Sequence, residues 1–90
     1  MSAKQVVITG RVQRVGYRDW MLAEATALGL SGWVRNRIDG AVEALISGPT
    51  PAVEELLRRC RRGPPRAEVS LIVEELAEPP DFPEFRRLDG

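Results

Sequence analysis

The order in which strand-like and helix-like hydrophobic patterns follow one another is the feature that most constrains the fold of this 90-residue chain. Alternating and β-branched apolar residues predict four strands, at residues 5–12, 32–38, 41–47 and 67–76. Apolar residues at helical spacing predict two helices, at residues 19–30 and 50–62. The order β-α-β-β-α-β is typical of a ferredoxin-like α+β sandwich, with a four- to five-stranded antiparallel sheet and both helices on one face.

Turn-forming residues separate these segments. Asp39-Gly40 is a strong signal for a hairpin between the two middle strands. Gly63 and the following Pro64-Pro65 end the second helix, since glycine adopts the left-handed conformation and proline cannot continue a helix. Gly10, inside the first strand, predicts a bulge or a close backbone approach. Residues 82–88 can form a short last strand, which Pro83 confines to a sheet edge or to a strand start.

Three amphipathic faces are expected to build the core. They consist of Met21, Leu22, Ala25 and Leu28 on the first helix, Val53, Leu56, Leu57 and Cys60 on the second, and Val69, Leu71 and Val73 on the last long strand. No linker, repeat or low-complexity tract interrupts the pattern. A chain of this length is therefore expected to form one domain over residues 1–90.

Histidine is absent from the sequence, and Cys60 is the single cysteine. Zinc sites built from Cys and His, Ser-His-Asp triads and imidazole general bases are therefore excluded. We also expect no metal and no other cofactor. A lone cysteine forms no intrachain disulfide, which is typical of the reducing cytosol. No apolar run has the length of a signal peptide or a membrane span. We therefore expect a cytoplasmic protein that does not contact a membrane.

Basic and acidic residues are balanced in number but not in position. Thirteen Lys and Arg offset thirteen Asp and Glu, and a formal net charge of zero does not indicate a nucleic-acid partner. Basic residues gather in residues 1–37 and 58–66, whereas residues 68–84 carry six acids and no base. Twelve of the thirteen bases are arginines, which suit planar recognition of phosphate or carboxylate. The placement indicates a small anion, with ordinary surface salt bridges as the alternative.

The segment Gly10–Arg18 joins the first strand to the first helix. A chain that turns tightly into a helix N-terminus directs successive amide N–H groups into one concavity, where the helix dipole adds partial positive charge. Arg18, in the first helical turn, is placed to grip two phosphate oxygens in bidentate fashion. The alternative is a plain loop that carries surface arginines.

The segment Gly32–Asn36 places an amide among aliphatic residues. Asn36 shares its parity with Val34 and Ile38, so its side chain is expected on the same face of the sheet as theirs. Buried polar groups need partners, so Asn36 is either a structural hydrogen-bonding residue or part of a site.

The chain resembles the acylphosphatase family in two motifs at the family's spacing, Gly-Arg-Val-Gln-Arg-Val-Gly-Tyr-Arg at 10–18 and Gly-Trp-Val-Arg-Asn at 32–36. The resemblance continues through Asp39-Gly40-Ala41-Val42-Glu43, Gly48-Pro49 and Gly63-Pro64-Pro65-Arg66-Ala67, and it covers residues 5–88. It implies a hydrolase that cleaves the carboxyl–phosphate bond of acyl phosphates.

The resemblance also implies a role for each motif. Arg18 matches the family's phosphate-binding arginine, and Asn36 matches the asparagine that positions the attacking water. The family's phosphate cradle matches the backbone amides of Gln13, Arg14, Val15, Gly16, Tyr17 and Arg18. One departure is Arg14, where the family usually has glycine. If that position requires a positive φ, a side chain there costs on the order of 1 kcal/mol or more.

An acyl phosphate carries a good leaving group, so its hydrolysis needs no strong general acid. Asn36 cannot accept a proton, so a phosphate oxygen of the substrate is the expected base. What remains for the protein is positioning and charge stabilisation. We expect a monomer that acts on a small-molecule acyl phosphate by metal-free in-line attack of water. Inorganic phosphate or another small oxyanion is expected to bind as product or inhibitor, and nucleic acid is not.

Three other interpretations remain open. A catalytically silent anion-binding or interaction domain would keep the fold and the cradle without turning over acyl phosphates. An RNA-recognition module shares the element order, but it needs exposed aromatic residues on adjacent central strands. A nucleophilic mechanism would use Asp19 or Cys60, although the predicted position of Cys60 on a core-facing helical stripe argues against it.

Overall fold

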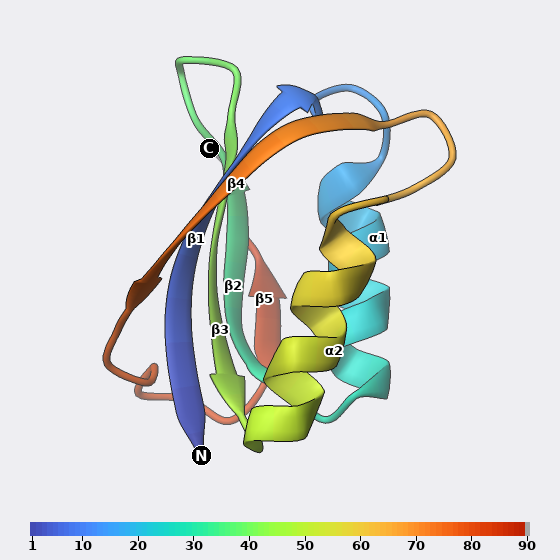
Figure 1. Ribbon diagram of the computed structural model, residues 1–90. Helices are drawn as coiled ribbons and strands as arrows, with labels where there is room; N and C mark the ends of the chain where they lie inside the picture. Colours follow the sequence, from blue (N-terminus) through green and yellow to red (C-terminus); the bar gives the residue numbers. More distant parts are fainter. Residues whose placement is uncertain (90) are drawn as a thin grey trace.

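The computed structural model describes residues 1–89, which form two helices and five strands (Figure 1). In chain order they are β1 (Ser2–Arg11), α1 (Tyr17–Ala27), β2 (Ser31–Asn36), β3 (Val42–Gly48), α2 (Thr50–Cys60), β4 (Glu68–Leu76) and β5 (Phe85–Arg87). The predicted β-α-β-β-α-β order is confirmed, and the last short strand is present as β5. Both helices lie on the same face of the sheet, as expected for a ferredoxin-like fold.

The strands form one sheet in the order β4-β1-β3-β2-β5. The strands β4, β1, β3 and β2 pair with one another in antiparallel fashion, whereas β5 is parallel to β2. The sheet is therefore mixed, and the expectation of an antiparallel sheet is wrong at this edge. The chain between β4 and β5 passes along one end of the sheet from edge to edge (Figure 1). It therefore enters β5 in the direction of β2. Leu88 N–H then donates to the Val34 carbonyl at 2.8 Å.

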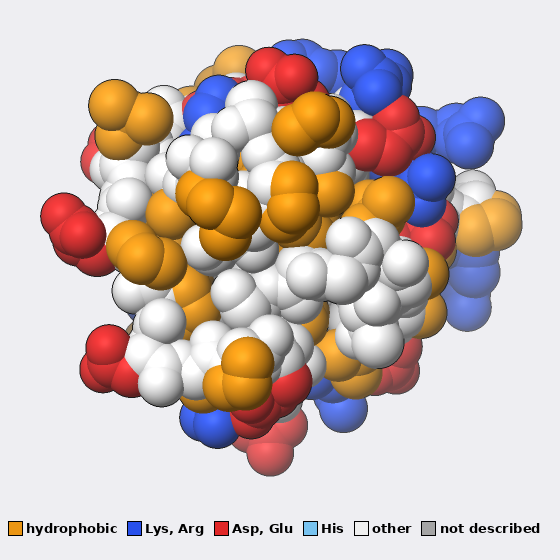
Figure 2. Space-filling model, turned by 90° about the horizontal axis from the view of Figure 1, so that it is seen from below, with side chains coloured by type: hydrophobic (Ala, Val, Ile, Leu, Met, Phe, Trp, Pro, Cys, Tyr) orange, Lys and Arg blue, Asp and Glu red, His pale blue; other side chains and the backbone are white. Residues whose placement is uncertain are grey.

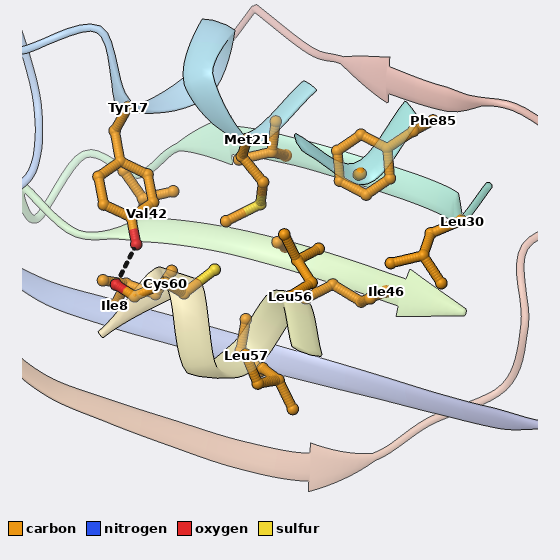
Figure 3. Close-up of a cluster of buried hydrophobic side chains, with 14 of the residues drawn as sticks. Ile8, Tyr17, Met21, Leu30, Val42, Ile46, Leu56, Leu57, Cys60 and Phe85 are labelled. Carbon is orange, nitrogen blue, oxygen red and sulfur yellow. Dashed lines mark hydrogen bonds between the residues drawn. The ribbon is translucent and has the colours of Figure 1, made fainter. Parts of the chain in front are cut away.

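The core fills the space between the sheet and the two helices (Figure 3). Inward residues of β1, β2 and β3 alternate along each strand and pack against the helices; they are Val6, Ile8, Val34, Val42, Ala44 and Ile46. The predicted face of α2 is confirmed, since Val53, Leu56, Leu57 and Cys60 are all buried. This packing holds the ends of β1 and β2 at fixed positions relative to the beginning of α1.

Helix α1 begins at Tyr17, earlier than expected, and ends at Ala27. Its inward face therefore runs through Tyr17, Met21 and Ala25, one turn apart, while the predicted core residues Leu22 and Leu28 are only half-buried. The Tyr17 hydroxyl donates to the Cys60 carbonyl at 2.6 Å (Figure 3). This buried bond joins the first turn of α1 to the last turn of α2.

The predicted inward face of β4 is wrong for two of its three residues. Leu71 and Val73 are 57% and 46% exposed on the face of the sheet that the helices leave open, and Ile72 points inward instead. The pairing with β1 shifts register between Thr9 and Gly10, so that β4 has one extra residue, Ser70, at this point. The bulge expected at Gly10 is thus confirmed, and it reverses the parity of every later residue in β4.

The end of the molecule at which β1 begins carries mainly uncharged atoms over its middle (Figure 2). A shallow hollow of about 230 Å³ lies at this end, between the start of β1 and the chain after β4. In the part of the chain that the structure describes, no helix combines the length and the hydrophobicity needed to cross a bilayer. The arginine-rich pocket described below lies at the opposite end.

Gly63 allows a test of the α1–α2 junction. Its φ is +67°, and an added Cβ would lie 2.6 Å from a ring carbon of Tyr17, which its hydrogen bond holds in place. Gly29 has nearly the same φ of +72° but nothing within 4 Å of an added Cβ. We expect Gly29→Ala to cost about 1 kcal/mol from backbone strain alone, and Gly63→Ala to cost about 1–3 kcal/mol more from overpacking. Urea unfolding measures both changes, and equal losses would show that the Tyr17 contact does not matter.

Candidate functional site

The two sequence motifs meet at one end of the sheet. The loop of residues 12–16, the first turn of α1, the end of β2 and the end of β5 enclose a pocket of about 210 Å³. It is lined by Val12, Arg14, Gly16, Tyr17, Arg18, Asp19, Asn36 and Arg87. Arg18 and Asn36, which are far apart in the sequence, therefore share one pocket.

Free amide groups face this region at the N-terminus of α1. Gly16 precedes the helix with φ +80°, and no side chain of residues 1–89 caps the helix end. The Trp20 N–H is the first to bond within the helix, to the Gly16 carbonyl at 3.0 Å. The amides before it have no intrahelical acceptor. Together with the helix dipole they provide donors for an anion.

Arg14 is the only residue other than glycine with a positive φ within residues 1–89. Its φ of +63° confirms that the position requires the left-handed conformation, at a cost of about 1–2 kcal/mol for a residue with a side chain. With Gly16, the loop has left-handed residues two positions apart. Turns of this kind direct consecutive N–H groups toward one point, as in anion-binding nests.

The Arg18 side chain is held from one side by the C-terminal segment. Its Nη1 donates to the Leu88 carbonyl at 2.9 Å and lies 4.0 Å from Asp89 Oδ1. The side chain is only 19% exposed. Its other guanidinium nitrogens make no hydrogen bond to any residue of the described chain, so they can bind a ligand in the pocket. This is the orientation that a bidentate grip on an oxyanion requires.

Asn36 is the last residue of β2 and is half-buried. Among residues 1–89 its side chain has no hydrogen-bond partner, which favours a site residue over a structural hydrogen-bonding one. The expectation that Ile38 shares its face is wrong, because β2 ends at Asn36 and Ile38 lies exposed in the hairpin turn. Val34 alone keeps the predicted parity, and it is fully buried.

Gln13 joins the loop to the hairpin that follows Asn36. Its Nε2 donates both hydrogens to main-chain carbonyls, at 2.8 Å to Arg37 and at 2.9 Å to Ala41. The Arg37 N–H donates to the same Ala41 carbonyl. The Gln13 and Val15 side chains do not line the pocket, since Val15 packs against the core. Any part that these two residues play in anion binding must therefore come from their backbone.

Arg87 and the Leu88 carbonyl are site components that were not predicted. Arg87 Nε lies 3.1 Å from Asp19 Oδ1, across the pocket wall. No local pattern identifies them, because only the parallel pairing of β5 with β2 brings them beside Asn36 and Arg18. Asp19 is thus an ion-pair partner of Arg87 in this structure.

The buried nucleophile candidates are unsuited to catalysis. Cys60 is fully buried, and burial raises the pKa of its thiol to about 12, so the reactive thiolate is absent near neutral pH. Burial also raises the pKa of the Tyr17 phenol, whose hydroxyl already donates to a carbonyl. Over residues 1–89 no group of three or more Asp, Glu, Cys or His side chains has the arrangement of a metal site. The groups that the pocket offers to a ligand are therefore mainly hydrogen-bond donors and positively charged side chains.

Comparison with known proteins finds a matching family model, similar sequences and similar solved structures. The model of the acylphosphatase family matches residues 4–87. An acylphosphatase of Acidiphilium cryptum is 62% identical over 85 residues, which cover 94% of this chain and 93% of that protein. The crystal structure of acylphosphatase from Bacillus subtilis has a TM-score of 0.91 at 32% identity, and the match covers 98% of this chain and 99% of that chain. An acylphosphatase structure from Coxiella burnetii gives 0.92 at 32% identity, covering 97% and 92%.

Proposed function

The chain belongs to the acylphosphatase family and is a hydrolase of acyl phosphates, and we propose that its reaction takes place in the pocket between Arg18 and Asn36. One observation carries this proposal. Two motifs that are separated by a whole helix meet in one pocket beside the N-terminus of α1. Among residues 1–89 they bring together a guanidinium with unused donors and an amide without a hydrogen-bond partner.

Binding of the phosphoryl group is the first step. The backbone amides of Gln13 to Arg18 surround its oxygens, and Arg18 binds two of them with the part of its guanidinium that Leu88 does not engage. The Leu88 carbonyl keeps the Arg18 side chain oriented before the substrate arrives, which reduces the ordering that binding requires. Gln13 fastens the cradle to the strand end that carries Asn36.

Attack by water is the second step. The Asn36 side chain orients a water molecule toward phosphorus, and a bond forms between the water oxygen and phosphorus as the bond from phosphorus to the acyl oxygen breaks. The carboxylate leaves with that electron pair, and a phosphate oxygen takes up a proton from the water. The amides and Arg18 stabilise the charge that spreads over the phosphoryl oxygens.

The pocket favours this reaction without a metal ion. Its charged lining consists of Arg14, Arg18 and Arg87 against Asp19 alone, and Asp19 is already paired with Arg87. An excess of fixed positive charge repels a divalent cation and supplies the charge stabilisation for which phosphoryl-transfer enzymes often use one.

Hydrolysis of benzoyl phosphate in a buffer that contains EDTA tests the function directly. We expect full turnover, with release of benzoate and inorganic phosphate in equal amounts, and competitive inhibition by added phosphate. Loss of activity on chelation, restored by a divalent cation, would contradict the proposed mechanism. Phosphate binding without any turnover would instead support a catalytically silent anion-binding domain, the alternative of the same fold.

The proposed partners are small molecules. Arg18, Asn36 and the N-terminus of α1 meet within a single chain, so we propose that a monomer is sufficient for catalysis, and we also propose a cytosolic location. An RNA-stacking platform is disfavoured because the central strands β1 and β3 carry no aromatic residue.

A further inference from the structure

Arg14 contributes a charged side chain where the backbone conformation calls for none. The loop presents its amides with a left-handed residue at this position, which glycine adopts without strain. Arg14 nevertheless occupies it, and its side chain lines the pocket. Strain that is retained beside a ligand pocket indicates that the side chain itself has a function.

The three arginines of the pocket differ in how they are engaged. Arg18 is 19% exposed and is bound to the Leu88 carbonyl, and Arg87 is paired with Asp19. Arg14 is exposed, and no residue of the described chain forms an ion pair or a side-chain hydrogen bond with it. Arg14 is therefore the cation at the outer part of the pocket whose donors are all available to a ligand.

The arginines of this pocket differ in exposure. Arg18, which binds the phosphoryl group in the proposed function, is only 19% exposed, whereas Arg14 in the same pocket is exposed. An acyl group that extends from the phosphoryl group toward solvent would therefore pass Arg14. We propose that Arg14 binds a second anionic group on the acyl portion of the substrate. The preferred substrates are then acyl phosphates of dicarboxylic or otherwise anionic acids.

This inference rests on the proposed function and adds a substrate class to it. Arg18 directs its remaining donors to the phosphoryl group, and Arg87 is paired through Nε with Asp19. Among residues 1–89, Arg14 is the pocket arginine with neither an ion-pair partner nor a side-chain hydrogen bond, and it is therefore the one with the most donors available to another anion. A guanidinium binds a carboxylate with two parallel hydrogen bonds, which gives the contact directional specificity. Because Arg14 is exposed, water screens the pair, and the preference that it produces is about threefold to fivefold.

The ratio of kcat/KM for succinyl phosphate to kcat/KM for benzoyl phosphate measures this preference. We expect Arg14→Gln, which retains the length but not the charge, and Arg14→Gly to lower the ratio about threefold to fivefold. Arg14→Lys is expected to retain most of it. Arg11→Gln is the matched control, since Arg11 is an exposed arginine three residues earlier that does not line the pocket. Its ratio is expected to equal that of the parent protein.

Each other outcome overturns the inference in a distinguishable way. Equal losses of kcat/KM for both substrates would show that Arg14 grips the phosphoryl group, and unchanged values of kcat/KM for both would show that its side chain contacts neither. A fall of the same size in Arg11→Gln would assign the effect to the general positive field of this end of the molecule. Failure of the parent protein to hydrolyse either substrate would overturn the proposed function as well.

Discussion

Replacing Arg18 with alanine is expected to lower kcat/KM for benzoyl phosphate by at least about a hundredfold, because loss of one preorganised donor typically costs that much and Arg18 supplies two with a charge. Its side chain is the cation inside the pocket that has free donors and a fixed orientation. Inhibition by inorganic phosphate is expected to weaken in parallel. Initial rates at substrate concentrations well below KM provide the measurement.

The fold is expected to survive this change. Within residues 1–89 the Arg18 side chain makes a single hydrogen bond, to the Leu88 carbonyl, and that carbonyl can bind water in its place. Arg18→Lys separates the effect of charge from that of geometry, since lysine retains the charge and lacks the planar fork. The activity of Arg18→Lys is expected to lie between that of the parent protein and that of Arg18→Ala. Wild-type turnover in Arg18→Ala, with a native circular dichroism spectrum, would remove Arg18 from the mechanism.

Replacing Asn36 with alanine is expected to lower kcat by about a hundredfold, the typical effect of removing one positioned polar group from a reaction centre. KM and the inhibition constant of phosphate are expected to change much less, because Asn36 acts on the water and not on the bound phosphoryl group. The separation of kcat from the phosphate inhibition constant is therefore the measurement that identifies this role.

A second substitution at the same position provides the control. Asn36→Asp retains the shape but places a negative charge beside the phosphoryl site, so it is expected to weaken phosphate inhibition as well as turnover. If Asn36→Ala instead raised the phosphate inhibition constant as strongly as Arg18→Ala does, Asn36 would be a binding residue. Unchanged kcat would mean that water is positioned by another group.

Local patterns were sufficient to predict most of the elements. The position of the second helix follows from its sequence, because the apolar spacing, the proline in its first turn and the Gly63 after it all indicate where the helix begins and ends. The prediction failed for β4, where the extra residue Ser70 shifts the alternation and sends Leu71 and Val73 to the open face. Such a bulge depends on pairing with β1, which the sequence of β4 alone does not reveal.

The sequence alone identifies both motifs of the candidate site but not the residues that surround them. Arg18 and Asn36 follow from short segments with a clear chemical meaning. Arg87, the Leu88 carbonyl and the bonds of the Gln13 side chain come from contacts between distant parts of the chain. They depend on the parallel direction of β5 and on the position of the hairpin, neither of which has a local signal.

The sequence by itself determined the element order, the buried stripe of α2, the left-handed turns and a chemistry without histidine, since these depend on residue type and short-range spacing. Only the tertiary structure decided that the C-terminal segment orients Arg18, that Asp19 pairs with Arg87 and that Arg14 has no ion-pair partner among residues 1–89. The physical reason is that charge pairing depends on distance in space. The total of zero net charge conceals which arginines have already found a partner and which are free to bind an anion.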